Sequence, residues 1–261
     1  MGILTGKTAI IYGAAGSIGS ATAKSFAEQG ARVYLAGRTR ETLEAVAKEI
    51  TAAGGLASAA VVDALDEDAV EAHAAAVAAE AGGIDITFNL VPRGDVQGIP
   101  LADMTVADLV RPVTNGLTSN FITARAAARR MAEQGSGVIL TLNSGSAYGS
   151  PMMGGTGPAD GALDTLVRNL ALELGPSGVR AVGIYCAGVP ETLTLEKLSA
   201  VNANITEEAV QGILANLDSM RMTRRSPSLA EIVGTATFLA SDQAGGITGT
   251  FVNVTGGMVA R

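Results

Sequence analysis

The sequence predicts a single α/β domain, in which about seven parallel strands form a doubly wound sheet with helices on both faces. Short apolar runs alternate with longer helical patterns along the 261 residues. The short runs are apolar throughout, which is typical of strands that are buried on both faces of a parallel sheet. No linker and no repeat of fixed period interrupts the alternation, so residues 1–261 are expected to fold as one domain.

The expected elements follow one another from the N-terminus. Strands are predicted by the apolar runs Lys7–Gly13, Ala31–Gly37, Leu56–Asp63, Ile84–Val91, Ser136–Ser144, Val179–Cys186 and Gly249–Gly257. Helices are predicted by the spacing of apolar residues in Ser17–Gly30, Arg40–Gly54, Asp66–Gly82, about Asp103–Gln134, part of Gly154–Arg180, and Pro227–Ser241. Residues 190–222 are polar and irregular, and they are expected to form a lid on the substrate side.

Charge and hydropathy limit the classes of partner. The formal net charge is −7 and the isoelectric point is about 4.8, which argues against nucleic acid or an anionic membrane as the main partner. An anionic cofactor would therefore need local help from helix N-termini or a placed arginine. The N-terminal segment has no signal-peptide pattern, and no apolar run reaches the ~18 residues of a membrane span. A cytoplasmic protein is expected.

One histidine and one cysteine exclude several kinds of site. A Cys/His zinc site is excluded by ligand count, no metal is expected, and a Ser-His-Asp hydrolase is nearly excluded. His73 lies in an Ala-rich helical stretch and is expected to be a solvated or partly buried surface residue. Cys186 has no partner for an intrachain disulfide, which fits a reducing compartment, and a packing role is favoured over a reactive thiol.

A glycine-rich turn follows the first strand. The segment "YGAAGSIG" places Gly13, Gly16 and Gly19 between a strand and a helix, which is the context of a dinucleotide-binding loop. Gly13 permits the sharp turn, a central glycine lets the backbone approach a pyrophosphate, and Gly19 lets the helix pack on the strand. Ser17 and Ile18 begin the helix, whose N–H groups would bind the phosphates. The alternative is a structural turn without a ligand.

The ends of the next three strands predict how the rest of a cofactor is bound. The second strand ends in Gly37 and Arg38, where an acid that binds the ribose of NAD would be expected. A guanidinium suits the 2′-phosphate of NADP, so NADP is favoured over NAD. The alternative is that Arg38 is an exposed residue at a strand end. Asp63 ends the third strand, where it can hydrogen-bond an adenine amino group, and Asn89 ends the fourth.

The chain resembles the short-chain dehydrogenase/reductase family over essentially its whole length. The segments that carry the resemblance are, in order, "GKTAIIYGAAGSIG", "AGR", "VVD", "GGIDI", "SGVILTLNS", "ALDTLVRNLALELGPSGVR", "FLASD" and "ITGTFVNVTGG". The resemblance implies a single Rossmann-type domain, a nicotinamide cofactor, a small-molecule substrate and a homo-oligomer, either a dimer or a tetramer.

Compared with the family pattern, the cofactor loop and the residues around it are altered. In the glycine loop T-G-x-x-x-G-x-G, Tyr12 replaces the threonine, and Ser17 stands in a usual glycine place. The N-N-A-G element keeps only Asn89. Asn115 matches the asparagine of the family's catalytic set with a shift of one residue.

The catalytic tyrosine and lysine of the family are replaced. The Y-x-x-x-K motif aligns with Thr156 and Asp160. The family's serine matches Ser144 along the fifth strand and Asn143 when counted back from the following helix, and Ser144 is preferred. In the family the tyrosine exchanges a proton with the substrate oxygen, and the lysine holds the ribose and lowers the pKa of the tyrosine. Thr156 has no useful acidity, and Asp160 reverses the charge.

Three groups are candidates for the missing proton donor. Tyr148 lies four residues after Ser144 and is either a displaced acid or a packing residue of the loop. Asp160 is either an acid whose pKa is raised by burial or a carboxylate favoured by the helix dipole. Ser144, with its neighbour Ser146, can bind an oxygen, although neither is a strong acid.

Three functions remain open from the sequence. The first is an NADP(H)-dependent oxidoreductase that acts on a carbonyl, an alcohol or an activated double bond. The second is a non-redox enzyme on the same fold, such as a lyase or a dehalogenase. The third is a catalytically silent protein that binds a dinucleotide or serves as a subunit or scaffold, because a fold alone does not decide function.

Overall fold

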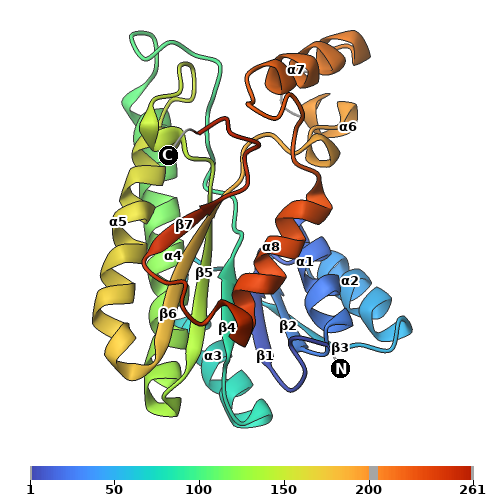
Figure 1. The fold of residues 1–261 in the computed structure, drawn as a ribbon, viewed down its shortest axis with the longest axis vertical. Helices are drawn as coiled ribbons and strands as arrows, with labels where there is room; N and C mark the ends of the chain where they lie inside the picture. The colour runs from blue at the N-terminus through green and yellow to red at the C-terminus, as the bar shows by residue number, and fades with distance from the viewer. Residues whose placement is uncertain (1, 200–204, 260–261) are drawn as a thin grey trace.

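The computed structural model describes residues 2–199 and 205–259, and its centre is a seven-stranded parallel sheet (Figure 1). The strand order is β3-β2-β1-β4-β5-β6-β7. The strands are β1 (Thr8–Tyr12), β2 (Arg32–Gly37), β3 (Leu56–Val61), β4 (Ile86–Asn89), β5 (Gly137–Asn143), β6 (Val179–Tyr185) and β7 (Thr250–Asn253). The chain runs outward from β1 to β3 and then returns to β4, so the strand order reverses between β1 and β4. Ligands of such sheets bind at this reversal, beyond the carboxyl ends of the strands.

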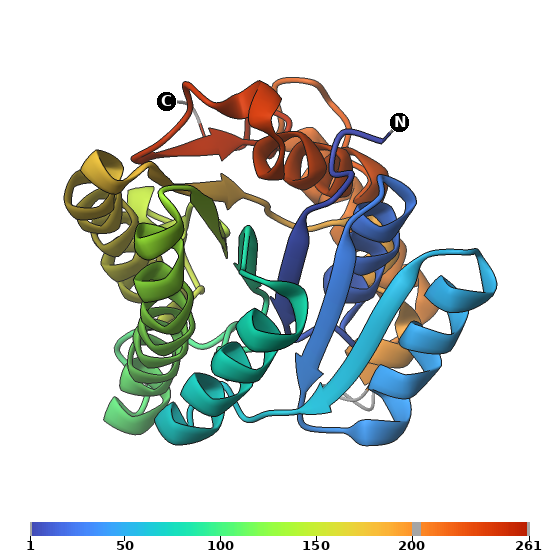
Figure 2. The same cartoon turned by 90° about the horizontal axis from the view of Figure 1, so that it is seen from below.

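Helices cover both faces of the sheet, as Figure 2 shows along the strands. One apolar core packs strand residues such as Ile11 and Leu35 against α1, α2 and α8. The other packs Ile10 and Tyr12 against α3, α4 and α5. Neighbouring residues of a strand point to opposite faces of the sheet. The residues on each face must therefore be apolar, because each face is covered by helices. The helices are α1 (Ser17–Glu28), α2 (Arg40–Ala52), α3 (Glu67–Ala81), α4 (Val106–Gln134), α5 (Thr156–Leu174) and α8 (Leu229–Ala240).

The predicted α/β domain with seven parallel strands is confirmed, although several elements are shorter than predicted. The helix predicted from about Asp103 begins at Val106, because Thr105 caps it by accepting a hydrogen bond from the N–H of Asp108 at 3.1 Å. The strand β6 stops at Tyr185, one residue before the predicted end, although the N–H of Cys186 still donates to the carbonyl of Asn143 on β5 at 2.7 Å.

The prediction that residues 190–222 are irregular is wrong. This segment contains a 3-10 turn η3 (Pro190–Thr192) and two helices, α6 (Leu195–Ser199) and α7 (Glu207–Ser219). Thr206 begins α7 by accepting a hydrogen bond from the N–H of Ala209, and Val210 is buried. Both helices stand beyond the carboxyl ends of the strands, at the top of Figure 1.

Candidate active site and cofactor site

The glycine turn between β1 and α1 is tightly packed. Gly13 has φ +77°, and a Cβ at this position would lie 2.6 Å from the carbonyl oxygen of Leu90. A Cβ on Gly19 would lie 2.3 Å from the carbonyl oxygen of Gly13. Only glycine fits at these two positions, because the turn must pass close to β4 and α1 must pack on the turn.

The N-terminus of α1 is suited to an anion. Its N-cap residue is Gly16, which has no side chain to cap the helix, and the first turn contains no acidic residue. The N–H groups at Ser17, Ile18 and Gly19 are therefore left without a side-chain acceptor from the N-cap. Uncapped N–H groups and the positive end of the helix dipole fit the pyrophosphate of a dinucleotide.

Two predicted cofactor residues lie at the ends of β2 and β3. Arg38 is exposed, and no carboxylate of the described residues lies within ion-pair distance of its guanidinium. In contrast, Arg40 pairs with Glu44 at 3.4 Å. Asp63 is exposed, and its Oδ1 accepts a hydrogen bond from the N–H of Leu65 at 3.0 Å. The guanidinium at position 38 is therefore available to an anionic group of a ligand.

Asn89 shapes the loop that follows β4. Its side chain is buried, with Nδ2 donating to Thr123 Oγ1 on α4 at 3.0 Å. Its Oδ1 accepts from the N–H of Val91 at 3.0 Å. Both ends of the amide are thus used to fix the first residues of the loop against α4, which is a positioning role.

Asp160 is at the centre of a buried polar network on α5. Its side chain is 0% exposed, and its Oδ2 accepts hydrogen bonds from Ser144 Oγ at 2.7 Å, Ser144 N at 3.1 Å and Ser146 N at 2.9 Å. Its Oδ1 accepts from Arg93 Nη1 at 2.8 Å. Both carboxylate oxygens therefore accept hydrogen bonds from the protein. Asp160 thus binds two loops to α5, in addition to being a carboxylate near the N-terminus of a helix.

Arg93 is a site residue that sequence reasoning missed. Its guanidinium, on a side chain only 13% exposed, bridges Asp160 and Asp95, with Nη2 at 3.2 Å from Asp95 Oδ1. Gly116 on α4 makes room for it, because a Cβ there would lie 2.6 Å from Arg93 Cδ. Asn115 Nδ2 donates to the backbone carbonyl of Arg93 at 3.2 Å. The signal in the sequence was the acid at position 160, because a buried carboxylate requires a cation or several donors nearby.

Thr156 joins the same network from the first turn of α5. Its buried hydroxyl donates to Asp95 Oδ1 at 2.8 Å and accepts from Gln97 Nε2 at 3.2 Å. Since Asp95 and Gln97 both belong to the loop after β4, this loop is bound to the start of α5. The hydroxyl is held by protein groups on both its donor and its acceptor side.

Tyr148 points to a different set of residues. It ends the 3-10 turn η1 (Ser146–Tyr148) and is 38% exposed. The hydroxyls of Tyr148 and Tyr185 are 3.0 Å apart, and the Tyr185 hydroxyl donates to Asp164 Oδ2 at 2.8 Å. Tyr185 has one proton to donate, so Tyr148 donates to it. Burial raises the pKa of the Asp164 carboxyl, while its hydrogen bonds from Tyr185 and Asn143 act in the opposite direction.

The lone thiol and the lone imidazole do not lie in this network. Burial raises the pKa of the Cys186 thiol to about 12, so a thiolate is not favoured at neutral pH. His73 is half-buried and packs edge-on against Tyr12, with ring centroids 6.1 Å apart. Burial lowers the pKa of this imidazole. Both residues fit the packing and surface roles that the sequence favoured.

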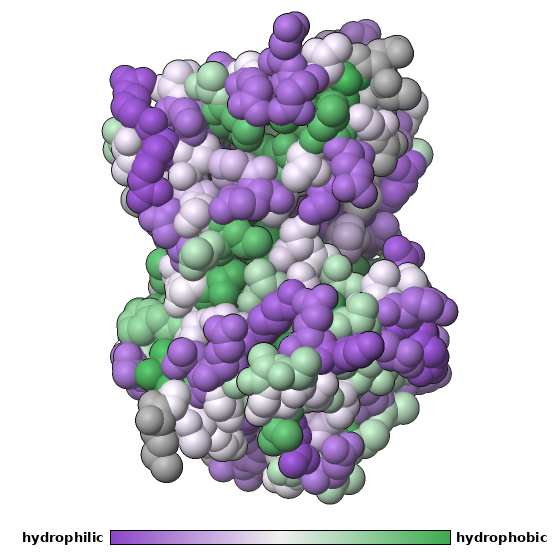
Figure 3. Space-filling model, turned by 90° about the vertical axis from the view of Figure 1, so that its right-hand side faces the viewer, coloured by the Kyte–Doolittle hydropathy of each residue, from purple (hydrophilic) through white to green (hydrophobic). Residues whose placement is uncertain are grey.

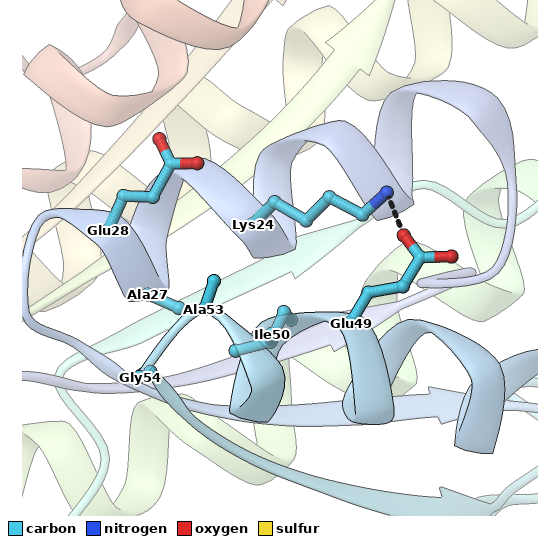
Figure 4. A pocket seen from close by; sticks show the side chains of 8 residues that line it. Lys24, Ala27, Glu28, Glu49, Ile50, Ala53 and Gly54 are labelled. Carbon is cyan, nitrogen blue, oxygen red and sulfur yellow. Dashed lines mark ion pairs between the residues drawn. The ribbon is translucent and has the colours of Figure 1, made fainter.

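Two recesses on the surface are lined by residues that lie outside the glycine turn. One of about 310 Å³ lies between α1 and α2, where Lys24 and Glu49 form an ion pair (Figure 4). Its polar side chains are those of this pair and of the neighbouring Glu28. Figure 3 shows a hollow with exposed apolar side chains between the upper and the lower part of the molecule. No group of three or more His, Cys, Asp and Glu side chains in the described ranges is placed to hold a metal ion.

No helix within residues 2–199 and 205–259 is long and apolar enough to cross a membrane.

Comparison with known proteins adds four findings to this geometry. A family model described as enoyl-(acyl carrier protein) reductase matches residues 13–259. The chain is 32% identical to L-rhamnose 1-dehydrogenase (NAD(P)(+)) of Azotobacter vinelandii, over 98% of each chain. It is 32% identical to 7alpha-hydroxysteroid dehydrogenase of Escherichia coli K12, covering 98% of this chain and 95% of that one. The crystal structure of NAD+-bound xylitol dehydrogenase matches with a TM-score of 0.86 at 28% identity, over 97% of this chain and 99% of that chain.

Proposed function

Because this chain belongs to the short-chain dehydrogenase/reductase family, it is an enzyme of the dehydrogenase/reductase kind, and we propose that it is an NADP(H)-dependent oxidoreductase with an atypical active site. Its substrate is a small molecule with a carbonyl, an alcohol or an activated double bond. The observation that carries the proposal is the uncapped N-terminus of α1 behind the glycine turn. A bound nicotinamide cofactor supplies or accepts a hydride in this chemistry.

Particular residues are proposed to hold each part of the cofactor. The backbone of the glycine turn, with Gly13, Gly16 and Gly19, binds the pyrophosphate together with Ser17 and Ile18 at the start of α1. The guanidinium of Arg38 binds the 2′-phosphate, and the carboxylate of Asp63 accepts a hydrogen bond from the adenine amino group. Asn89 fixes the loop beside them through Thr123 and Val91.

Replacing Arg38 with methionine is expected to weaken NADPH binding by about 10- to 100-fold, because an arginine–phosphate pair is charge-assisted and often bidentate. NADH has no 2′-phosphate, so its affinity is expected to change less than about twofold. Fluorescence titration of both cofactors measures this difference. The matched control is Arg40→Met, because Arg40 is exposed on the same segment but already pairs with Glu44. Equal losses for NADPH and NADH in Arg38→Met would contradict NADP preference.

Tyr148 is proposed as the proton donor in reduction. It would give its hydroxyl proton to the substrate oxygen as the carbon receives the hydride, and the same steps reverse in oxidation. Thr156 lacks the acidity, and both oxygens of Asp160 already accept hydrogen bonds. For this step, the Tyr148 hydroxyl exchanges its bond to Tyr185 for a bond to the substrate.

Tyr148→Phe is therefore expected to lower kcat about a hundredfold, the lower end of the range for removal of a general acid. The Kd for NADPH is expected to stay unchanged, because the hydroxyl is assigned no role in cofactor binding. Steady-state NADPH oxidation with the best substrate from a carbonyl screen measures kcat. Tyr34→Phe is the matched control, because the Tyr34 hydroxyl bonds to Glu80 on α3 and not to the site. Full activity in Tyr148→Phe would show that the tyrosine only packs the loop.

A catalytically silent dinucleotide-binding protein is the second candidate, favoured by the closed network of Arg93, Asp95, Thr156 and Asp160. In this network Thr156 and Asp160 already form hydrogen bonds with other protein groups, so they are not available to a substrate oxygen. The two candidates are separated by titrating NADPH and NADH and then screening carbonyl substrates for NADPH consumption. Absence of binding to both cofactors would refute the oxidoreductase, whereas binding without turnover would support the silent protein.

We also propose that the protein is a cytoplasmic homo-oligomer, either a dimer or a tetramer. An apolar stripe is exposed along α4, and it consists of Val106, Val110, Leu117 and Phe121. These residues recur at helical spacing, so they form one face that a second copy of α4 can cover. Light scattering of the purified protein measures the mass that distinguishes these states from a monomer.

A further inference from the structure

Three side chains form a hydrogen-bonded chain that leads from the surface of η1 to a buried carboxylate on α5. The hydroxyl of Tyr148, an exposed residue, lies 3.0 Å from the hydroxyl of Tyr185 on β6. The Tyr185 hydroxyl donates to Asp164 Oδ2 at 2.8 Å. Tyr185 and Asp164 are both buried. Consecutive hydrogen bonds of this kind polarise one another, and a proton can pass along them.

The ring of Tyr185 is held by packing that does not involve its hydroxyl. It stacks on the ring of Phe251 on β7, with centroids 4.6 Å apart and planes 14° apart. The ring of Tyr148 meets it edge-on, with centroids 5.9 Å apart. A phenylalanine at position 185 would keep these ring contacts and would remove only the hydroxyl from the chain.

Asp164 differs from Asp160, another buried carboxylate of α5, in the donors that surround it. Asp160 accepts four hydrogen bonds, one of them from a guanidinium. Within the described residues, Asp164 accepts hydrogen bonds from two neutral groups only, the hydroxyl of Tyr185 and the amide of Asn143 at 3.0 Å. The guanidinium of Arg168 lies 3.8 Å from Asp164 on a half-exposed side chain. The negative charge of Asp164 is therefore the less compensated of the two.

The surroundings of Asp164 favour uptake of a proton. Burial is the largest influence on this carboxyl and raises its pKa, and the charge of Asp160 acts in the same direction. The hydrogen bonds from Tyr185 and Asn143 and the charge of Arg168 act against this shift. A carboxylate with a raised pKa is a better proton acceptor than an ordinary one.

We propose that Tyr185 and Asp164 relay the proton that Tyr148 exchanges with the substrate. The inference rests on the proposed function, because it concerns the proton donor of the same site. When an alcohol is oxidised, its O–H bond breaks and the proton moves to the Tyr148 oxygen. At the same time the Tyr148 proton moves to Tyr185, and the Tyr185 proton moves to Asp164. The hydride leaves the same carbon for the nicotinamide cofactor, which takes up both electrons.

Reduction uses the same chain in the opposite direction. The Asp164 carboxyl then begins protonated, and each hydroxyl turns so that it donates toward the substrate. After the product has left, the exposed Tyr148 hydroxyl exchanges the proton of the chain with water. Tyr185 and Asp164 act through Tyr148 and do not touch the substrate, so both are positioning residues.

The first test breaks the chain at its middle. Tyr185→Phe is expected to lower kcat about tenfold, less than the full effect of losing a general acid, because Tyr148 can still exchange its proton with water. The double variant Tyr148→Phe, Tyr185→Phe is expected to be no slower than Tyr148→Phe, because both changes interrupt one chain. Tyr34→Phe is the matched control, since its hydroxyl bonds to Glu80 outside this chain.

The second test removes the end of the chain and follows the pH dependence. Oxidation requires the Asp164 carboxylate, so kcat for oxidation is expected to fall about tenfold per pH unit below the pKa of that carboxyl. This fall is expected to be absent in Asp164→Asn. In Arg168→Met it is expected to begin at a higher pH, because the charge of Arg168 lowers the pKa of Asp164. A purely structural role of Asp164 would leave the shape of the profile unchanged.

Carbon-13 NMR of the Asp164 carboxyl supplies a readout that does not depend on activity. Its midpoint in the wild type is expected to match that of the pH–rate profile, and Tyr185→Phe is expected to raise the midpoint by removing a hydrogen bond to the carboxylate. If the wild type binds no dinucleotide, the proposed function and the inference fail together. If the wild type turns over and Tyr185→Phe is fully active, only the inference fails. An unchanged pH profile in Asp164→Asn would equally overturn the relay.

Discussion

Replacing Arg93 with methionine is expected to lower the free energy of unfolding by about 3–5 kcal/mol, the typical effect of removing one partner of a buried ion pair. The side chain of Asp160 is 0% exposed, and Arg93 is its ion-pair partner at 2.8 Å. Methionine fills a similar volume but leaves Asp160 with only the donors of Ser144 and Ser146. Equilibrium unfolding in urea, followed by circular dichroism, measures the change.

A double variant separates the effect of the unpaired Asp160 charge on stability from the effect of lost packing around Arg93. The double variant Arg93→Met, Asp160→Asn removes both charges. Its loss of unfolding free energy is expected to be smaller than the sum of the losses in the two single variants. Arg111→Met on α4 is the matched control, because Arg111 is nearly half exposed and its pair with Asp108 lies at the surface. Additive losses in the double variant would show that Arg93 and Asp160 act independently, contrary to their assigned pairing.

The fold was predictable because the same local pattern, an apolar strand followed by an amphipathic helix, recurs along the chain. Each buried strand is a continuous apolar run, such as Thr8–Tyr12, and each connection is long enough for a helix. The order of strands then follows from right-handed crossovers. The ends of elements were less predictable, because they depend on single caps such as Thr105.

The candidate site was predictable only in part. The sequence predicted that Ser144 and Asp160 share one site, and they are joined by a hydrogen bond of 2.7 Å. The partner of Asp160 was not predicted, because Arg93 comes from a loop without periodicity, 67 residues away. Tyr148, predicted beside them, has its hydroxyl bound to Tyr185 on β6 instead.

The segment 190–222 was the least predictable part, because its helices pack through few buried apolar residues. In α7 only Val210 is buried among the residues of that helix. Polar contacts instead hold the segment, and the most buried of them belong to Arg221. An arginine in a polar stretch of sequence gives no sign that it is buried, since arginine is usually exposed.

Arg221→Met is the second change expected to have a large effect, about 3–5 kcal/mol in the free energy of unfolding. The side chain of Arg221 is 1% exposed. Its Nε donates to the carbonyl of Thr255 at 3.0 Å, and its Nη2 donates to the carbonyls of Ala187 and Gly188. Ala187 and Gly188 follow β6, and Thr255 follows β7. The guanidinium of Arg221, two residues after the end of α7, therefore binds the ends of two strands together. Methionine would leave several buried carbonyls without donors.

Two measurements test whether Arg221 supports the segment as well as the domain. Urea unfolding gives the global loss, with Arg225→Met as the control, because Arg225 forms an exposed pair with Glu231 and its loss should leave the midpoint unchanged. Amide exchange in α7 gives the local loss, which is expected to accompany the global one. If amide exchange in α7 stays normal while the unfolding free energy falls strongly, Arg221 stabilises the ends of β6 and β7 but does not support α7.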